Sequence, residues 1–215
     1  YVSAVCASGD TSDARMARFT TACGEIATLP YMQNFENSPT GGNTSSTWVD
    51  CWYRLNNGTS YYGYPYVSSS TSYNHTTGGT KGLYWYGSTT TGSYGDYQVI
   101  ILPPIDTTVF NVTSLELSFW ARSSSTSYSP VFYVGVMTDS TNVNSFQPVD
   151  TANVGSNTSW AEYSTTFENF TGYGAYLAIK AVRPSSSWYA YVDDIKVDVV
   201  PDCPAVSNMV ASHDL

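Results

Sequence analysis

Hydrophobic and polar residues alternate with a period of two along much of this chain. The clearest case is the segment 113–122. One of its faces carries Leu115, Leu117, Phe119 and Ala121, and the other carries Glu116, Ser118, Trp120 and Arg122. Successive side chains of a β-strand point to opposite faces, so this segment is predicted to be a strand with one buried face. No stretch shows the sustained three-and-four spacing of an amphipathic helix, and almost no helix is expected.

Further strands are predicted where short apolar or alternating runs lie between turn residues. These runs are 48–55, 82–86, 97–102, 131–138, 160–167, 175–182 and 189–200. A long polar loop is expected over 56–80, and one helical turn around Phe146. Many short strands punctuated by turns indicate an all-β fold, an antiparallel two-sheet sandwich over residues 25–200.

The two ends of the chain break this pattern. Residues 1–24 are predicted to form two strands with a turn at 7–10, and a lone hairpin is at best marginally stable in water. We therefore interpret 1–24 as the end of a preceding module. After the turn at 201–204, residues 205–215 are too few for a domain and are interpreted as the beginning of a following module.

Charged residues make up only 12% of the chain, against about 25% in average soluble domains. The net charge is −9, which would repel a nucleic-acid backbone or an anionic membrane surface. No run of apolar residues is long enough for membrane insertion. The acidity is compatible with Ca²⁺ binding, and equally with the solubility of a secreted protein.

The chain has four cysteines, Cys6, Cys23, Cys51 and Cys203, none of them in a CxxC pair. This spacing argues against a zinc site and favours disulfides formed in an oxidising compartment. Four cysteines allow three pairings, and the sequence does not choose among them. Because Cys6 and Cys23 fall in adjacent predicted strands, we expect them to be able to form a disulfide within the N-terminal hairpin.

Catalytic chemistry has little support in the sequence. A serine nucleophile needs a base, usually histidine, and the two histidines lie in a Gly/Thr/Ser loop (His75) and in the trailing segment (His213). No G-x-S-x-G motif is present. The sequence therefore predicts a protein that is not an enzyme.

Five segments, taken together and in order, resemble the bacterial cleaved-adhesin and choice-of-anchor J modules, which are relatives of the MAM domain. These segments are LPYMQNFEN (29–37), CWYRLN (51–56), SLELSFWARS (114–123), VGVMTDSTNVNSFQPV (134–149) and YVDDIKV (191–197). At the ends, YVSAVC, FTTAC and CPAVSNMVASHDL resemble parts of fibronectin type III modules.

The resemblance implies a jelly-roll sandwich, a structural Ca²⁺ in many members, and roles in adhesion or glycan binding. The expected function is that of a non-catalytic module of a large bacterial protein, secreted or at the cell surface. Such a module would bind a glycan or a host surface protein, and would adjoin further modules of the same chain. Two alternatives stay open: an accessory domain of a secreted protease or glycoside hydrolase, with a carbohydrate-binding or spacing role, and a pure spacer.

Candidate Ca²⁺ ligands are Glu36, on the first strand of the module, and an aspartate of the last strand. Alternation places Asp194 on the same face as Val192 and Asp193 on the other, which favours Asp194. The acidic loop usual in the resembled family is replaced here by GGNTSST (41–47). The alternative is that these carboxylates are merely solvated or cap turns.

Candidate ligand-binding residues are aromatic, because sugar rings stack on exposed aromatic faces and tyrosine and tryptophan also anchor protein interfaces. They are Tyr61, Tyr62, Tyr64, Tyr66, Trp188 and Tyr189. The alternative is that the tyrosines fold back over the sandwich and cover an exposed strand edge. Trp48 and Trp52 are assigned to the core.

Overall fold

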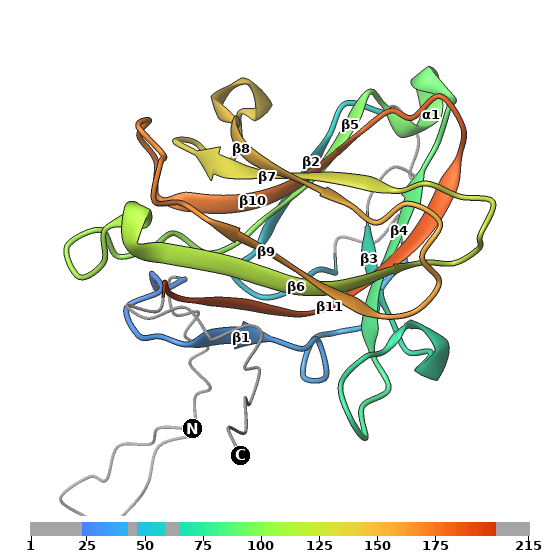
Figure 1. Cartoon of the computed structure of the whole chain (residues 1–215), viewed down its shortest axis with the longest axis horizontal. Coiled ribbons are helices and arrows are strands. Elements are labelled where there is room, and N and C mark those ends of the chain that lie inside the picture. Colours follow the sequence, from blue (N-terminus) through green and yellow to red (C-terminus); the bar gives the residue numbers. More distant parts are fainter. Residues whose placement is uncertain (1–22, 43–46, 59–64, 201–215) are drawn as a thin grey trace, which may run out of the picture.

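The computed structural model describes residues 23–42, 47–58 and 65–200 of the chain. Within these ranges the strands form two antiparallel sheets packed face to face, which confirms the predicted all-β sandwich. Figure 1 shows the two layers, with β6, β11 and β1 lying below β7 and β10. No helix in the described part of the chain is long and apolar enough to cross a membrane.

In each sheet, strands that are neighbours in space come from distant parts of the sequence. The larger sheet has the order β3-β4-β11-β6-β9, with β1 added beside β11, and the smaller has the order β2-β5-β10-β7-β8. The larger sheet contains β1 (Tyr31–Gln33), β3 (Tyr66–Ser68), β4 (Gly82–Gly87), β6 (Leu115–Ser123), β9 (Ala161–Thr166) and β11 (Trp188–Val199). The smaller contains β2 (Tyr53–Asn56), β5 (Tyr97–Ile101), β7 (Val131–Met137), β8 (Gln147–Asn153) and β10 (Tyr176–Val182). Short helical turns are η2 (Thr71–Tyr73), α1 (Thr91–Tyr94), η3 (Val112–Ser114) and η4 (Val143–Ser145).

The core lies between the sheets and follows the period-two pattern. Leu115, Leu117, Phe119 and Ala121 are all fully buried, as their alternation predicts. Trp85 of β4 and Phe132 of β7 meet across the sandwich with ring centroids 4.9 Å apart. Trp52 is buried, as expected, while Trp48 is half-buried and packs against the same core.

Two strands, β3 and β8, were not predicted from the sequence. β8 pairs only with β7 and is a largely exposed edge strand, so it lacks the apolar run that marks a buried strand. It also contains Pro148, which stands opposite Gly135 where the register shifts. Proline at an edge or a bulge is compatible with a sheet because the missing N–H is not needed there.

β11 is the long central strand of the larger sheet. One edge pairs with β6 from Ala190 to Val199, whereas the other edge is divided between β4 and β1. Between these two partners the register against β6 shifts from Asp193 to Lys196, which is a β-bulge, and Asp194 has a φ of 47°. A bulge adds a residue and interrupts strict alternation of faces.

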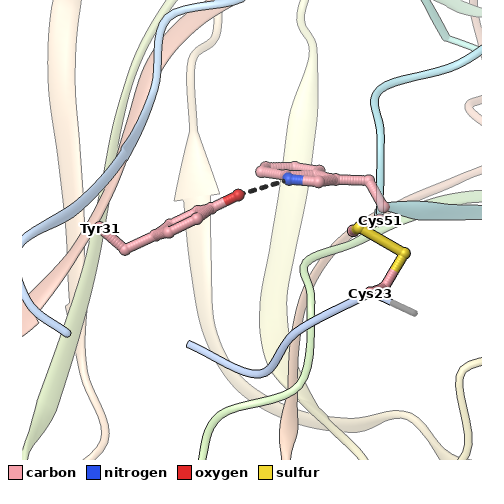
Figure 2. The surroundings of a disulfide bond; sticks show 4 residues. Cys23, Tyr31 and Cys51 are labelled. Atoms are coloured by element: carbon pink, nitrogen blue, oxygen red, sulfur yellow. Dashed lines mark hydrogen bonds between the residues drawn. A yellow bond between two sulfur atoms is a disulfide. The ribbon is translucent and has the colours of Figure 1, made fainter. Parts of the chain in front are cut away.

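The predicted Cys6–Cys23 disulfide is wrong, because Cys23 is bonded to Cys51, with Cα atoms 5.1 Å apart. Local alternation suggested a partner within the N-terminal hairpin, but Cys23 leads directly into Ile26, which forms a β-bridge with Ile105 of the sandwich. Figure 2 shows the disulfide beside a hydrogen bond of 2.7 Å from the indole nitrogen of Trp52 to the hydroxyl of Tyr31.

The proposed module boundaries at the two ends involve residues 1–22 and 201–215, which lie outside the described residues. The division into 1–24, 25–200 and 201–215 therefore stays a prediction. Cys23, which was assigned to the first segment, is covalently joined to the sandwich.

Replacing Cys23 and Cys51 together by serine should destabilise the sandwich. The bond closes a loop with a sequence separation of 28, which corresponds to about 3–4 kcal/mol of unfolded-state chain entropy. Urea unfolding should show a free energy of unfolding lower by about that amount. Adding a reductant to the wild type should reproduce most of the loss, and equal stability of the double variant and the oxidised wild type would contradict this role.

Candidate functional site

Tyrosines of neighbouring strands form a row across the outer face of the larger sheet. Tyr66 of β3 stands opposite Tyr84 of β4, and Tyr84 stands opposite Tyr191 of β11. Tyr191 in turn faces Arg122 of β6, whose guanidinium lies 4.5 Å from the Tyr191 ring centroid and 5.4 Å from that of Trp160. Directly opposed residues on one face of a sheet contact each other, so the pairing of the strands produces the row.

A second row runs beside the first. Tyr86 and Tyr189 stand opposite each other, and their rings stack at 4.5 Å with an interplanar angle of 15°. Tyr94 contacts Tyr86 edge-on, with ring centroids 4.9 Å apart, and the ring centroids of Tyr128 and Tyr189 are 5.6 Å apart. We call the two rows together the tyrosine ladder.

The segment after β3 lies on the ladder and adds to it. Tyr73 of η2 stacks on Tyr191 with ring centroids 4.4 Å apart, and the His75 ring stacks on Trp120 with centroids 4.0 Å apart. Arg122 donates a hydrogen bond to the carbonyl oxygen of Ser72. The ladder therefore comprises Tyr66, Tyr73, Tyr84, Tyr86, Tyr94, Tyr128, Tyr189 and Tyr191, bordered by Arg122, Trp120, Trp160 and His75.

The stacking decides which part of each ring meets solvent. Rings that stack in parallel cover each other's faces, and the side chains of the ladder are half-buried. Each ring of the two stacked pairs, Tyr73–Tyr191 and Tyr86–Tyr189, therefore has one face covered by its partner. Burial raises the pKa of Tyr66, Tyr84 and Tyr191, and the neighbouring phenols add to this effect, so these hydroxyls are neutral at physiological pH.

Of the aromatic residues singled out from the sequence, Tyr66 and Tyr189 both lie on this face. Trp188 is a correction: it is only 2% exposed and its ring packs on Phe132 in the core, 5.6 Å between centroids. The neighbour of an outward-facing residue on a regular strand must face inward, so Tyr189 and Trp188 cannot share a surface. Tyr61, Tyr62 and Tyr64 lie outside the described residues.

Sequence reasoning missed most of the ladder, although a signal was present. Tyrosines recur with a period of two in LYWYG (83–87) and in WYAYV (188–192), where they alternate with buried residues. That pattern identifies two strands with aromatic outer faces. It does not reveal that the two strands are neighbours.

A carboxylate cluster lies at the gap between β4 and β1 on the edge of β11. Glu36 follows β1, and its Oε1 accepts hydrogen bonds from the backbone N–H groups of Thr80 (2.9 Å) and Lys81 (2.8 Å). Asp193 is fully buried, and its Oδ2 accepts from the backbone N–H groups of His75 (2.7 Å) and Thr76 (3.2 Å). The two carboxylates thus hold both ends of the 74–81 segment.

The side-chain amide of Asn74 stands between the two carboxylates. Its nitrogen lies 3.0 Å from Glu36 Oε1, 2.9 Å from the carbonyl oxygen of Lys81 and 3.3 Å from Asp193 Oδ2. An amide group has two hydrogens, so it cannot satisfy three acceptors at once. Three oxygen atoms, two of them from carboxylates, therefore converge on one point.

Asp193 has no cationic side chain as a partner among the described residues. The ammonium group of Lys81 donates instead to the carbonyl oxygens of Glu36 and Ser38, at 2.8 Å each. His75 Nδ1 lies 2.6 Å from Asp194 Oδ2. Burial raises the pKa of Asp193 to about 6, against the opposing effect of its backbone N–H donors.

The structure changes the residue of the last strand that meets Glu36. Asp193 shares the Asn74 amide with Glu36, whereas Asp194 contacts His75 and Thr76. Strict alternation favoured Asp194, but the bulge lets both aspartates reach the same loop. No group of three or more His, Cys, Asp or Glu side chains in the described ranges is arranged to hold a metal ion, so the cluster offers two carboxylates, a carbonyl and an amide.

Comparison with solved structures identifies proteins that have the same fold. No protein-family model and no curated protein matches the sequence. The K1 cleaved adhesin domain of Lys-gingipain from Porphyromonas gingivalis has a similar structure, with a TM-score of 0.58 and 13% identity over 81% of this chain and 100% of that domain. The K2 domain of Lys-gingipain gives a TM-score of 0.56 and 14% identity, over 80% of this chain and 99% of that domain. The K3 domain of Lys-gingipain from Porphyromonas gingivalis gives a TM-score of 0.54 and 10% identity, over 78% of this chain and 97% of that domain. The chain therefore has the jelly-roll sandwich fold seen in cleaved adhesin domains.

Proposed function

We propose that this chain is a non-catalytic adhesion module of a secreted or cell-surface protein, and that it contacts a partner protein through the tyrosine ladder. The observation that carries the proposal is the collection of tyrosine, tryptophan and arginine on one sheet face. These three residue types dominate the binding energy of protein interfaces. The Cys23–Cys51 disulfide supports an oxidising, extracytoplasmic setting.

The orientation of the rings favours a protein partner over a stacked sugar. Stacking of a sugar requires a free aromatic face, whereas in the Tyr73–Tyr191 and Tyr86–Tyr189 pairs of the ladder each ring already has one face covered. Ring edges and neutral hydroxyls instead match the mixed polar and apolar surface of a protein. Because the side chains already hold one another in place, little rotamer freedom is lost on binding.

Truncation of single ladder tyrosines should weaken this contact. In surface plasmon resonance against an immobilised panel of extracellular-matrix and cell-surface proteins, Tyr84→Ala and Tyr189→Ala should each weaken binding by about 10–30-fold, the effect of losing a hot-spot side chain. Tyr53→Ala is the matched control, because Tyr53 is 38% exposed and belongs to the other sheet.

Tyr84→Phe and Tyr189→Phe separate binding from folding, since they keep the ring contacts and remove only the hydroxyl. Both should keep the thermal stability of the wild type while weakening binding. Ladder variants that bind the panel as tightly as Tyr53→Ala would reject the proposed surface.

We also propose a structural Ca²⁺ at the carboxylate cluster. The residues fit such an ion: oxygen atoms of Glu36, Asp193 and the Lys81 carbonyl already converge, and the Asn74 amide can turn its oxygen to the same point. A buried carboxylate without a cationic partner supports the same assignment. Two of the three non-glycine residues with positive φ in the described ranges, Phe35 and Asp194, directly adjoin these carboxylates, and such backbone outliers concentrate at ligand clamps.

Removal of calcium should lower the melting temperature. An ion that binds only the folded state stabilises it by about 2.7 kcal/mol at a hundredfold excess over Kd, or roughly 5–10 °C for a domain of this size. Differential scanning fluorimetry with calcium and with a chelator should show this shift. Mg²⁺ should substitute poorly, because it demands a tighter octahedral shell.

Glu36→Gln should abolish the calcium-dependent shift, while Glu168→Gln, at an exposed position, should retain it. Identical melting curves in calcium and in chelator for the wild type would exclude the ion. The cluster would then be held by the Asn74 amide and the backbone donors alone.

A further inference from the structure

A groove lies at one end of the sandwich, beside the segment 170–174 that joins β9 to β10. It consists of two adjoining cavities of about 380 Å³ and about 350 Å³, both lined by Phe170 and Gly172. The residues before β6 close the first cavity, and the beginning of β8 closes the second. Each volume falls within the range of about 300–1,000 Å³ typical of small-molecule sites. We call this feature the end groove.

Tyr173 borders the end groove with a free ring. Its side chain is 83% exposed and makes no ring contact with another described residue. The ladder tyrosines differ, because each of them contacts at least one other aromatic ring. Tyr173 therefore offers an aromatic face that a ligand can cover.

The backbone around Tyr173 is fixed in place. Gln147 donates a hydrogen bond of 2.7 Å to the Tyr173 carbonyl oxygen. A Cβ at Gly172 would lie 2.0 Å from Gln147 Oε1, and one at Gly174 would lie 2.4 Å from the Met137 carbonyl oxygen. At Gly174 the neighbour is backbone and φ is 149°, so only glycine fits there, and the backbone that carries Tyr173 is set before any ligand arrives.

The chemistry of the groove is neutral and polar at its rim. None of the described residues that line the two cavities carries a charge, although the chain has a net charge of −9. Phe110 and Phe170 supply apolar walls, and Asn111, Asn169 and Thr171 supply exposed amide and hydroxyl groups. The side chains of Asn169 and Thr171 make no hydrogen bond to other described residues.

We propose that the end groove binds a neutral saccharide, with a sugar ring stacked on Tyr173. The apolar face of a sugar ring matches a free aromatic face, and its hydroxyls match the unpaired side chains of Asn169 and Thr171 at the rim. A charged ligand would find no counter-charge in the groove, and an anionic one would be repelled by the acidic surface. A purely apolar ligand would leave the side chains of Asn169 and Thr171 without partners. The site is separate from the tyrosine ladder and does not depend on the proposed protein contact.

Isothermal titration calorimetry with maltohexaose, xylohexaose and mannohexaose tests the proposal, with an oligogalacturonate as the acidic counterpart. At least one neutral hexasaccharide should bind, and the oligogalacturonate should bind more weakly. Tyr173→Ala should weaken binding by at least about tenfold, and Tyr173→Phe should stay within about twofold of the wild type because it keeps the ring. Asn169→Asp should also weaken binding, since it places a charge in the neutral rim. Tyr53→Ala is the control for an exposed tyrosine elsewhere.

Three results would overturn the end-groove site. They are the absence of binding by all three neutral hexasaccharides, preference for the oligogalacturonate, and loss of saccharide binding in Tyr189→Ala with retention in Tyr173→Ala. Tyr173→Ala should bind the protein panel as the wild type does, so failure of this site and failure of the ladder are distinguishable.

Discussion

The structure depends on how the gap in one edge of β11 is closed. β6 pairs with β11 from Ala190 to Val199, but β4 and β1 support only the two ends of the opposite edge, and the bulge at Asp193–Asp194 lies between them. Backbone groups brought into such a gap must find hydrogen-bond partners. Asp193 and Glu36 provide them, accepting the N–H groups of His75, Thr76, Thr80 and Lys81. The 74–81 segment is thereby tied to both the first and the last strand.

The same segment links the carboxylate cluster to the tyrosine ladder. His75 donates its backbone N–H to Asp193, pairs its ring nitrogen with Asp194, and stacks its ring on Trp120. Tyr73, just before it, stacks on Tyr191 at the centre of the ladder. The positions of Tyr73 and His75 on the aromatic surface are therefore supported by hydrogen bonds to acidic residues, whereas strand pairing places the other tyrosines. A cation at the cluster would stabilise the surface without touching any ligand.

The two candidate binding surfaces differ in how they use aromatic rings. In the ladder, neighbouring strands place tyrosines opposite each other, so that the rings contact one another and stacked pairs such as Tyr86 and Tyr189 each cover one face of the partner ring. In the end groove, Tyr173 stands on a glycine-flanked loop and makes no ring contact with another described residue. Sheet pairing produces the first arrangement and a loop isolated from the sheet produces the second. The difference in exposed chemistry follows from the backbone rather than from the residue type.

The sequence by itself determined which residues face the core and which strands exist in the apolar parts of the chain. Leu115 to Ala121 alternate because a strand points successive side chains to opposite faces, a local property that needs no knowledge of partners. It also associated Glu36 with the last strand, through a resemblance of motifs. Tertiary structure decided the rest, because each remaining feature depends on pairings between distant segments. The bulge on β11 selected Asp193 over Asp194, the bridge at Ile26 brought Cys23 to Cys51, and the pairing of β4 with β11 assembled the ladder. A polar edge strand such as β8 can be recognised only from its pairing with β7. Its own residues are mostly exposed, so they lack the apolar pattern that marks a buried strand.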